Sequence, residues 1–269
     1  MNRRRFLQLL TLGTLGLAGS VPTYAWGEAH RFSISRHQFK LPRLERDLRV
    51  AHLSDLHFGR WHREPAIRNW VNATLAQNPD LIVITGDLVD GRTSIPRLEA
   101  LVAELARLQA PLGVFATWGN HDYSLRRLEA FGQMLEKAGI RVLTNAGAQI
   151  RPDLYLAGVD DYWRGEVDVA RAIRDATPTA ATLLLSHNPD ILPQVPSSVG
   201  LVLSGHTHGG QVRAPFGVGL HSISRFGERY QMGFIKEQTT AFVSRGLGTS
   251  TVPVRSFCPA ELVVLEMQA

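Results

Sequence analysis

The residues from Leu81 to Asp87, LIVITGD, decide the fold of this chain. The first five are apolar or β-branched, and a short continuous run of this kind that ends at a turn residue is typical of a buried strand. Gly86 ends the run and permits close approach of the backbone, and the carboxylate of Asp87 follows directly. A chemically active side chain is therefore expected just beyond the carboxyl end of a buried strand.

The same arrangement recurs four more times along the chain. Apolar runs at 50–53, 182–185 and 201–203, and a mixed run at 112–118, precede the clusters Asp55-Leu56-His57, Ser186-His187, Gly205-His206-Thr207-His208 and Gly119-Asn120-His121-Asp122. In open α/β sheets, functional sites gather at the carboxyl ends of the strands. The five clusters are therefore expected to meet in one place.

The pattern around these strands predicts one α/β domain with helices between the early strands and a β-rich last third. Helices are expected around Ile67 to Leu75, after Pro96, after Ser124 as N-cap, and between Val167 and Ala176. We expect two packed mixed β-sheets flanked by helices, with the site at the strand ends. The segment 26–46 is polar and is expected to be an irregular lead-in, as a strand or a strap, to a domain at 47–269. The segment 213–232 is expected to be a long loop or irregular hairpin beside the site.

The N-terminal segment 1–25 is predicted to be an export signal. Arg3, Arg4 and Arg5 precede an apolar stretch from Phe6 to Ala18, and the pattern resembles a twin-arginine signal. The twin-arginine translocase is then a partner during export, and the expected location is the periplasm or the outer face of the cytoplasmic membrane. Cleavage and retention as an anchor both remain open, and retention implies membrane association through this segment. The alternative is a basic tail that stays in the cytoplasm.

The charge of the chain does not indicate a nucleic-acid partner. The formal net charge is +5, and Arg3, Arg4 and Arg5 supply three of those charges, which leaves about +2 for the rest. We therefore expect no nucleic-acid binding. Cys258 is the one cysteine and is expected to be a buried, inert thiol.

The five clusters combine carboxylates, imidazoles and one amide, with no thiolate. This donor set favours Mn²⁺, Fe²⁺ or Zn²⁺ and argues against a cysteine-type structural zinc site. Asp55 and His57 are two residues apart, as are His206 and His208, so each pair points to one side of an extended segment.

Taken in order, Asp-x-His, Gly-Asp, Gly-Asn-His-Asp, a lone His and Gly-His-x-His resemble the calcineurin-like metallophosphoesterase superfamily. The resemblance runs from Asp55 to His208, and its five motifs in order are specific. Later pieces at 209–211, 244–248 and 253–255 are similar to an exported bacterial phosphodiesterase branch. The resemblance implies a calcineurin-like sandwich and two divalent ions. By motif position, one ion would be held by Asp55, His57, Asp87 and His208, and the other by Asp87, Asn120, His187 and His206.

The resemblance also implies a metal-dependent phosphoester hydrolase, with a phosphodiesterase as the leading interpretation. Two ions about 3.5–4 Å apart can clamp the attacking and leaving oxygens, and a bridging hydroxide attacks phosphorus in line. His121 is expected to protonate the leaving alkoxide or stabilise the phosphoryl oxygens, with Asp122 orienting its ring.

Two alternatives stay open at this point. One is a phosphomonoesterase on the same site, and the other is a non-catalytic protein that binds metal or a phospholipid headgroup. His121 beside intact ligands favours an enzyme. The substrate is a phosphoester, with lipid- and envelope-derived esters among the candidates, and Arg213, Arg245 and Arg255 are candidate phosphate ligands.

Overall fold

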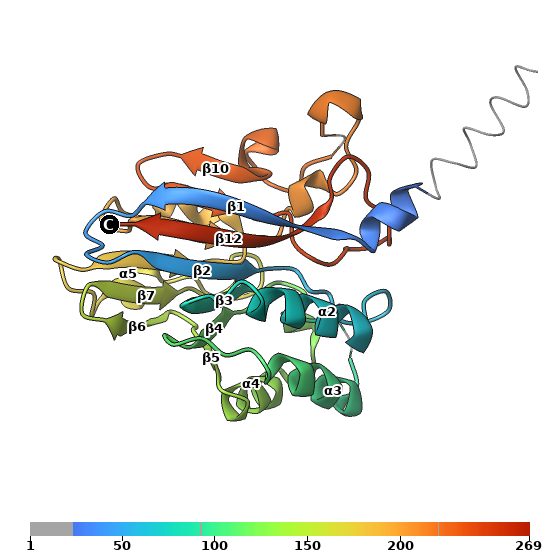
Figure 1. Cartoon of the computed structure of the whole chain (residues 1–269), viewed down its shortest axis with the longest axis horizontal. Coiled ribbons are helices and arrows are strands. Elements are labelled where there is room, and N and C mark those ends of the chain that lie inside the picture. Colours follow the sequence, from blue (N-terminus) through green and yellow to red (C-terminus); the bar gives the residue numbers. More distant parts are fainter. Residues whose placement is uncertain (1–23, 92, 220) are drawn as a thin grey trace, which may run out of the picture.

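Two six-stranded sheets pack face to face with helices on the outside (Figure 1), which confirms the expected α/β sandwich. The computed structural model describes residues 24–269 apart from 92 and 220. No helix in these residues is both long and apolar enough to cross a membrane. The predicted signal lies at 1–25, so residues 1–23 of it are outside the described part of the chain.

The first sheet has the order β1-β12-β2-β3-β4-β5. Its strands are β1 (Phe32–Lys40), β12 (Ala260–Gln268), β2 (Leu48–Leu53), β3 (Leu81–Thr85), β4 (Val114–Thr117) and β5 (Ile140–Val142). The strands β2 to β5 are parallel, because the helices α2 (Glu64–Leu75), α3 (Ile95–Leu105) and α4 (Leu128–Lys137) return the chain between them. The last strand, β12, is antiparallel to β2 and parallel to β1.

The second sheet has the order β10-β11-β9-β8-β7-β6. Its strands are β10 (Gly233–Lys236), β11 (Thr240–Val243), β9 (Leu201–Ser204), β8 (Ala181–Leu185), β7 (Leu154–Gly158) and β6 (Ala146–Arg151), and the short helix α5 (Val169–Ile173) packs near β6 and β7. The four inner strands are parallel, and the two edge strands β10 and β6 are antiparallel to their neighbours.

The burial of β3 on both faces explains its continuous apolar run. Ile82 and Ile84 face the cluster beneath α2, α3 and α4, whereas Leu81 and Val83 face the core between the two sheets. Neither face meets water, so the alternation of a half-buried strand is absent. The turn that carries Asp87 therefore follows a strand that is buried on both faces.

The structure refines one local prediction and corrects another. The lead-in expected at 26–46 as a strand or a strap contains a strand, because β1 lies within it and pairs with β12 along its full length, so only the expected irregularity is wrong. Alternate polar residues on this edge strand face outward and hid the pattern. The third helix begins at Leu128 rather than after Ser124, because Leu125 takes an extended conformation and Ser124 ends a 3₁₀ turn that starts at Asp122.

Candidate metal centre

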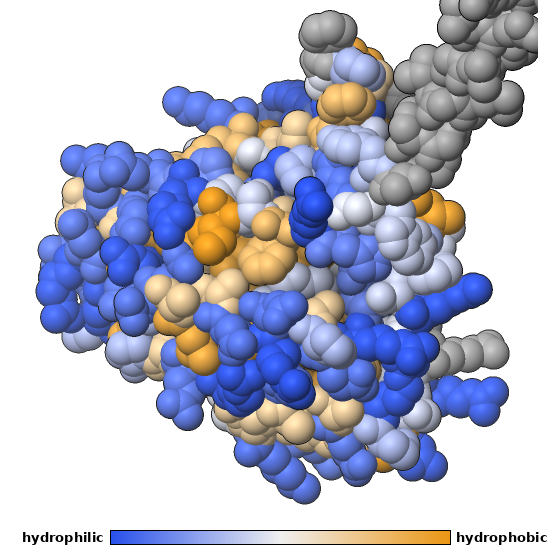
Figure 2. All heavy atoms as spheres, turned by 45° about the vertical axis from the view of Figure 1, so that its right-hand side comes forward, coloured by the Kyte–Doolittle hydropathy of each residue, from blue (hydrophilic) through white to orange (hydrophobic). Residues whose placement is uncertain are grey.

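The five predicted clusters meet at the carboxyl ends of the strands. The loops after β2, β3 and β4 of the first sheet face the loops after β8 and β9 of the second. This edge lies at the right-hand end of Figure 1, and Figure 2 turns that end toward the viewer. The predicted donors Asp55, His57, Asp87, His187, His206 and His208 are buried there, each with 4% or less of the whole residue exposed.

Five of these residues share an unusual backbone conformation. The φ angles are 53° at Asp55, 43° at His57, 50° at Asp87, 71° at His206 and 51° at His208. Left-handed conformations at non-glycine residues cost on the order of 1–3 kcal/mol each and cluster at functional sites. The Asp-x-His and His-x-His pairs therefore converge through left-handed turns, not through the extended segments that their spacing suggested.

Gly86 allows the two halves of the site to meet. A Cβ atom at this position would lie 2.6 Å from the backbone nitrogen of Gly119 and 2.8 Å from Nδ1 of His187. Real Cβ atoms do not approach other atoms this closely, so a side chain at position 86 would push the two loops apart. The close approach expected from the sequence is confirmed.

One group of donors surrounds the imidazole of His57. Its Nε2 atom lies 3.5 Å from Oδ2 of Asp87 and 3.0 Å from Nε2 of His208. Nε2 of His208 lies in turn 3.4 Å from Oδ1 of Asp55. Burial lowers the pKa of His57 to about 4, so its ring is neutral at pH 7 and offers a lone pair.

A second group of donors lies on the other side of Asp87. Nε2 of His187 is 3.3 Å from Oδ2 of Asp87 and 3.1 Å from Nδ1 of His206. Nδ1 of His187 lies 2.8 Å from the carbonyl oxygen of Thr85, which fixes the proton on Nδ1 and turns the lone pair of Nε2 inward. Asp87 thus lies between the two groups.

Two buried carboxylates, those of Asp55 and Asp87, lie close together and are stabilised by a nearby positive charge. Burial raises the pKa of Asp55 to about 6. Burial also raises the pKa of Asp87, but the adjacent His187 outweighs it and holds that pKa well below its usual range. Burial lowers the pKa of His187, but Asp87 outweighs it and raises that pKa to about 10. A proton on His187 or a bound cation can therefore balance the carboxylates.

The donor set fits two divalent ions. Asp55, His57 and His208 present three ligand atoms within 4.8 Å of one another, and so do Asp55, Asp87 and His187. Within the described part of the chain, Oδ1 of Asn120 and Nε2 of His206 are buried without any hydrogen-bond partner. Buried polar atoms are normally paired, so these two atoms indicate a missing ligand.

Residues 48–210 match the family model for calcineurin-like phosphoesterases. The chain belongs to this family. A metallophosphoesterase of Aquifex aeolicus is 32% identical over 256 residues, which cover 91% of this chain and 95% of that protein. The metallophosphoesterase YkuE of Bacillus subtilis is 27% identical, over 100% of this chain and 98% of that protein. A solved dimetal phosphatase from Danio rerio is similar with a TM-score of 0.49 and 14% identity, covering 77% of this chain and 89% of that chain.

His121 of this phosphoesterase lies beside the metal donors and reaches the solvent. Its side chain is 31% exposed, and Nδ1 lies 3.5 Å from Oδ1 of Asp90. The contact with Asp90 raises the pKa of His121. Asp90 was not among the residues predicted from the sequence, although it follows Asp87 by three residues, a spacing that can bring side chains together in a turn.

Asp122 does not make the contact that we expected of it. Its carboxylate accepts hydrogen bonds from the backbone N–H groups of Val89 and Gly119. It therefore ties the loop after β4 to the loop after β3, and the role of orienting His121 falls to Asp90. Burial raises the pKa of Asp122 to about 7.

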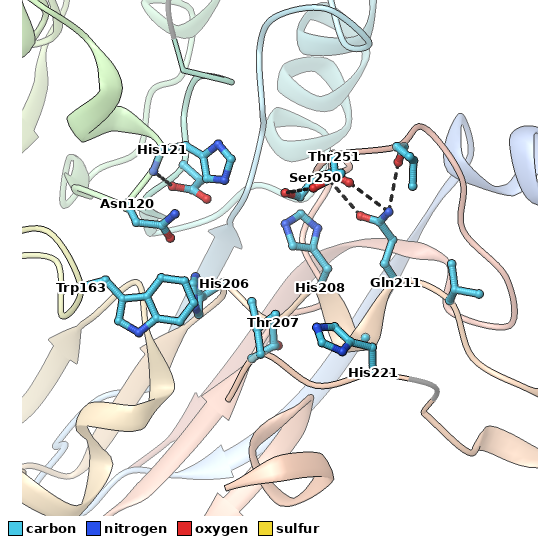
Figure 3. A pocket seen from close by; sticks show the side chains of 15 residues that line it. Asn120, His121, Trp163, His206, Thr207, His208, Gln211, His221, Ser250 and Thr251 are labelled. Atoms are coloured by element: carbon cyan, nitrogen blue, oxygen red, sulfur yellow. Dashed lines mark hydrogen bonds between the residues drawn. The ribbon is translucent and has the colours of Figure 1, made fainter. Parts of the chain in front are cut away.

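An open cavity of about 370 Å³ leads to the metal donors. Figure 3 shows Trp163 on one side of His206 and His208, and Gln211, His221, Ser250 and Thr251 on the other. The ring of Trp163 lies edge-on to His206, with centroids 4.3 Å apart. Sequence analysis missed Trp163, because a tryptophan in a loop carries no periodic signal.

The three candidate arginines are used elsewhere. Arg255 is fully buried and donates to the carbonyl oxygens of Arg245 and Gly248, while Arg245 pairs with Glu261 at 2.7 Å. Arg213 donates to Gly209 and Gln231. They brace the loops behind the site rather than line the cavity. Cys258 is buried, as expected, and burial raises the pKa of its thiol.

Proposed function

We propose that this phosphoesterase is a metal-dependent phosphodiesterase. The shape of the cavity carries the proposal, because its lining extends past the donors to Trp163 on one side and to Gln211 on the other. A diester has a substituent on each side of phosphorus and needs both spaces. A monoesterase needs only one.

The charge of the cavity supports the same substrate class. Among the described residues that line it, none is Lys or Arg. A monoester carries about 1.5 to 2 negative charges at neutral pH, whereas a diester carries one. Apart from the two ions, His121 is the one group of the described lining that the site uses as a cation, and this modest positive charge is better matched to the diester.

The residues divide the chemistry between them. When bound, two divalent ions supply Lewis acidity, an activated nucleophile and charge neutralisation. Asp55, His57, Asp87, Asn120, His187, His206 and His208 would hold these ions, and Asp87 lies between the two groups of donors. His121 lines the cavity, where its ring can protonate the leaving oxygen, and Asp90 keeps that ring oriented and its proton in place.

A paired substrate screen tests the proposal. The metal-loaded protein is assayed with bis(p-nitrophenyl) phosphate and with p-nitrophenyl phosphate, each with added Mn²⁺, Fe²⁺ or Zn²⁺ and with chelator as control. We expect a higher kcat/KM for the diester and loss of turnover with chelator. A preference for the monoester would favour the phosphomonoesterase, and binding of metal without any turnover would favour the non-catalytic alternative.

We also propose that the protein acts outside the cytoplasmic membrane after export by the twin-arginine route. The paired Arg3 and Arg4 before Phe6 support this location. Changing both arginines to lysine should retain the protein in the cytoplasm, which cell fractionation measures. Normal export of the doubly substituted protein would reject the twin-arginine route.

A further inference from the structure

Large apolar side chains are exposed around the mouth of the cavity. The exposed fractions are 51% for Tyr24, 48% for Trp26, 57% for Val218, 47% for Val252 and 50% for Phe257. Figure 2 shows apolar surface at this end of the molecule, divided by hydrophilic side chains. We name these five residues the apolar rim.

The apolar rim is continuous with the cavity. Val252 lines the cavity, and its carbonyl oxygen accepts a hydrogen bond from Gln211. Two residues beyond Gln211, the backbone N–H of Arg213 donates a hydrogen bond to the carbonyl oxygen of Ser256. The adjoining Phe257 places its ring 5.9 Å from the ring of Tyr24.

Val218 and Trp26 extend the rim on either side. The carbonyl oxygen of Val218 accepts a hydrogen bond from the backbone N–H of Ala214. Val218 therefore lies near Arg213, whose N–H donates to Ser256. The ring of Trp26 lies 6.1 Å from that of Trp61. Exposed apolar and aromatic side chains thus lead from Val252 at the cavity to Phe257 and Tyr24, and Trp26 with Trp61 lies beyond them.

Exposed arginines accompany the aromatic rings on this end of the molecule. The guanidinium of Arg60 lies 4.5 Å from the ring centroid of Trp61, and that of Arg225 lies 5.3 Å from Tyr162. Tyr162 directly precedes Trp163 of the cavity. Aromatic residues mixed with arginines are typical of surfaces that lie at the interface of an anionic bilayer.

The position of Tyr24 adds an independent observation. Tyr24 is the first described residue, and the 23 residues before it in the sequence include Arg3 to Arg5 and the apolar stretch from Phe6 to Ala18. Where the segment 1–25 is retained rather than cleaved, the chain enters the described fold at the apolar rim. Any attachment of that stretch to a membrane would bring the rim to the same membrane.

We propose that the apolar rim docks on an anionic phospholipid bilayer and presents the cavity to phosphodiesters of membrane lipids. This inference rests on the proposed function for its substrate class. In the reaction, a P–O bond forms to the oxygen of water, the P–O bond to one alcohol breaks, and that alcohol leaves with a proton. The other substituent stays on the resulting phosphomonoester.

A fluorescent label reads the docking face directly in the full chain. The variant Val218→Cys is labelled with an environment-sensitive fluorophore, with Phe234→Cys as the matched control. Phe234 is 43% exposed but stacks on Phe39, at the far end of the first sheet from the site. The native Cys258 is buried and competes little for the label.

With phosphatidylcholine vesicles that contain phosphatidylglycerol, the label at position 218 should shift to the blue and the label at 234 should not. No shift at 218, or equal shifts at both positions, would overturn docking through the rim. A shift at 218 that needs no vesicles and grows with protein concentration would overturn it in favour of a second copy of the chain.

A hydrolysis assay tests the substrate class. The double variant Val218→Asp and Phe257→Asp should lose at least about tenfold in rate on a vesicle-embedded phospholipid, because burial of large apolar side chains is lost. Its rate on the same headgroup in a short-chain, monomeric lipid should be unchanged, and Phe234→Asp should alter neither rate. Equal rates of the double variant and the wild type on vesicles would reject the inference. Absence of turnover on every diester would reject the proposed function, while the fluorescence result would still decide docking.

Discussion

The two halves of the metal centre differ in the donors that they supply. The first sheet supplies both carboxylates and the amide, from Asp55, Asp87 and Asn120, together with His57. The second sheet supplies three imidazoles and no carboxylate. The negative charge that would attract cations therefore lies on the first sheet, and the second sheet offers imidazole donors to complete the candidate site.

Hydrogen bonds across the boundary hold the halves in register. The ring of His187 on the second sheet contacts the carbonyl oxygen of Thr85 on the first, and the backbone N–H of His206 donates to Asp55 at 3.0 Å. Each half thus orients ligands of the other. The comparison predicts that replacing a carboxylate donor of the first sheet removes both negative charge and bound metal. Replacing a neighbouring residue that is not a donor, such as His121 or Asp90, should lower the activity less.

The largest effect is expected at Asp87, the carboxylate that both halves share. Asp87→Asn keeps a residue that tolerates the left-handed backbone but removes the charge. We expect loss of most bound metal and a fall in activity of more than about 10⁴-fold, because several kcal/mol of transition-state stabilisation depend on the ions. Elemental analysis and a diester assay measure both, with the exposed Asp175→Asn as control. Two ions per chain in Asp87→Asn would refute the shared role.

The next effect is expected at His121, which belongs to the first half but holds no ion in our assignment. His121→Ala should keep both ions and lose about 10²–10⁴-fold in rate on diesters with alkoxide leaving groups. The loss on an aryl leaving group should be smaller, because that group needs little proton assistance. Equal losses on the two substrates would indicate electrostatic stabilisation instead, and loss of metal would make His121 structural.

A smaller effect is expected at Asp90, which acts through His121. Asp90→Asn should lower kcat by about tenfold, since partners that orient a functional imidazole are typically worth 10- to 100-fold. KM and metal content should stay near wild-type values. The double variant with His121→Ala should be no worse than His121→Ala alone. Additive losses, or loss of an ion, would show that Asp90 acts on the metal directly.

The last effect concerns stability against acid rather than activity, and it involves His52 of β2. Burial lowers the pKa of His52 to about 4. Between pH 6.5 and about 4, His52 is therefore protonated in the unfolded chain but neutral in the native state. Stability therefore falls as the pH drops through this window. At pH 4.5, His52→Gln should recover about 2–3 kcal/mol of the stability that the wild type loses relative to pH 7. Urea unfolding of both chelator-treated proteins at the two pH values measures the difference, and equal losses would contradict it.

The parts of the molecule that the sequence predicts are those where one physical signal dominates. Buried parallel strands such as β3 are continuous apolar runs, and all of the predicted donors except Asn120, which follows a mixed run, lie in the loops after such runs. Asp90 and Trp163 lie in loops, where neither periodicity nor a preceding strand marks them. The edge strand β1 could be predicted only as a strand or a strap, since its solvent-facing positions are polar and weaken the apolar pattern.

The left-handed backbone conformations of the candidate metal centre lower the stability of the fold, but the side chains at these positions are needed for activity. Glycine at Asp55, His57, Asp87, His206 or His208 would relax the backbone at that position, but it would remove a donor atom each time. The fold therefore retains conformational energy that selection for stability alone would eliminate. Variants selected only for resistance to heat should accumulate glycine at these positions and lose hydrolysis as they gain stability.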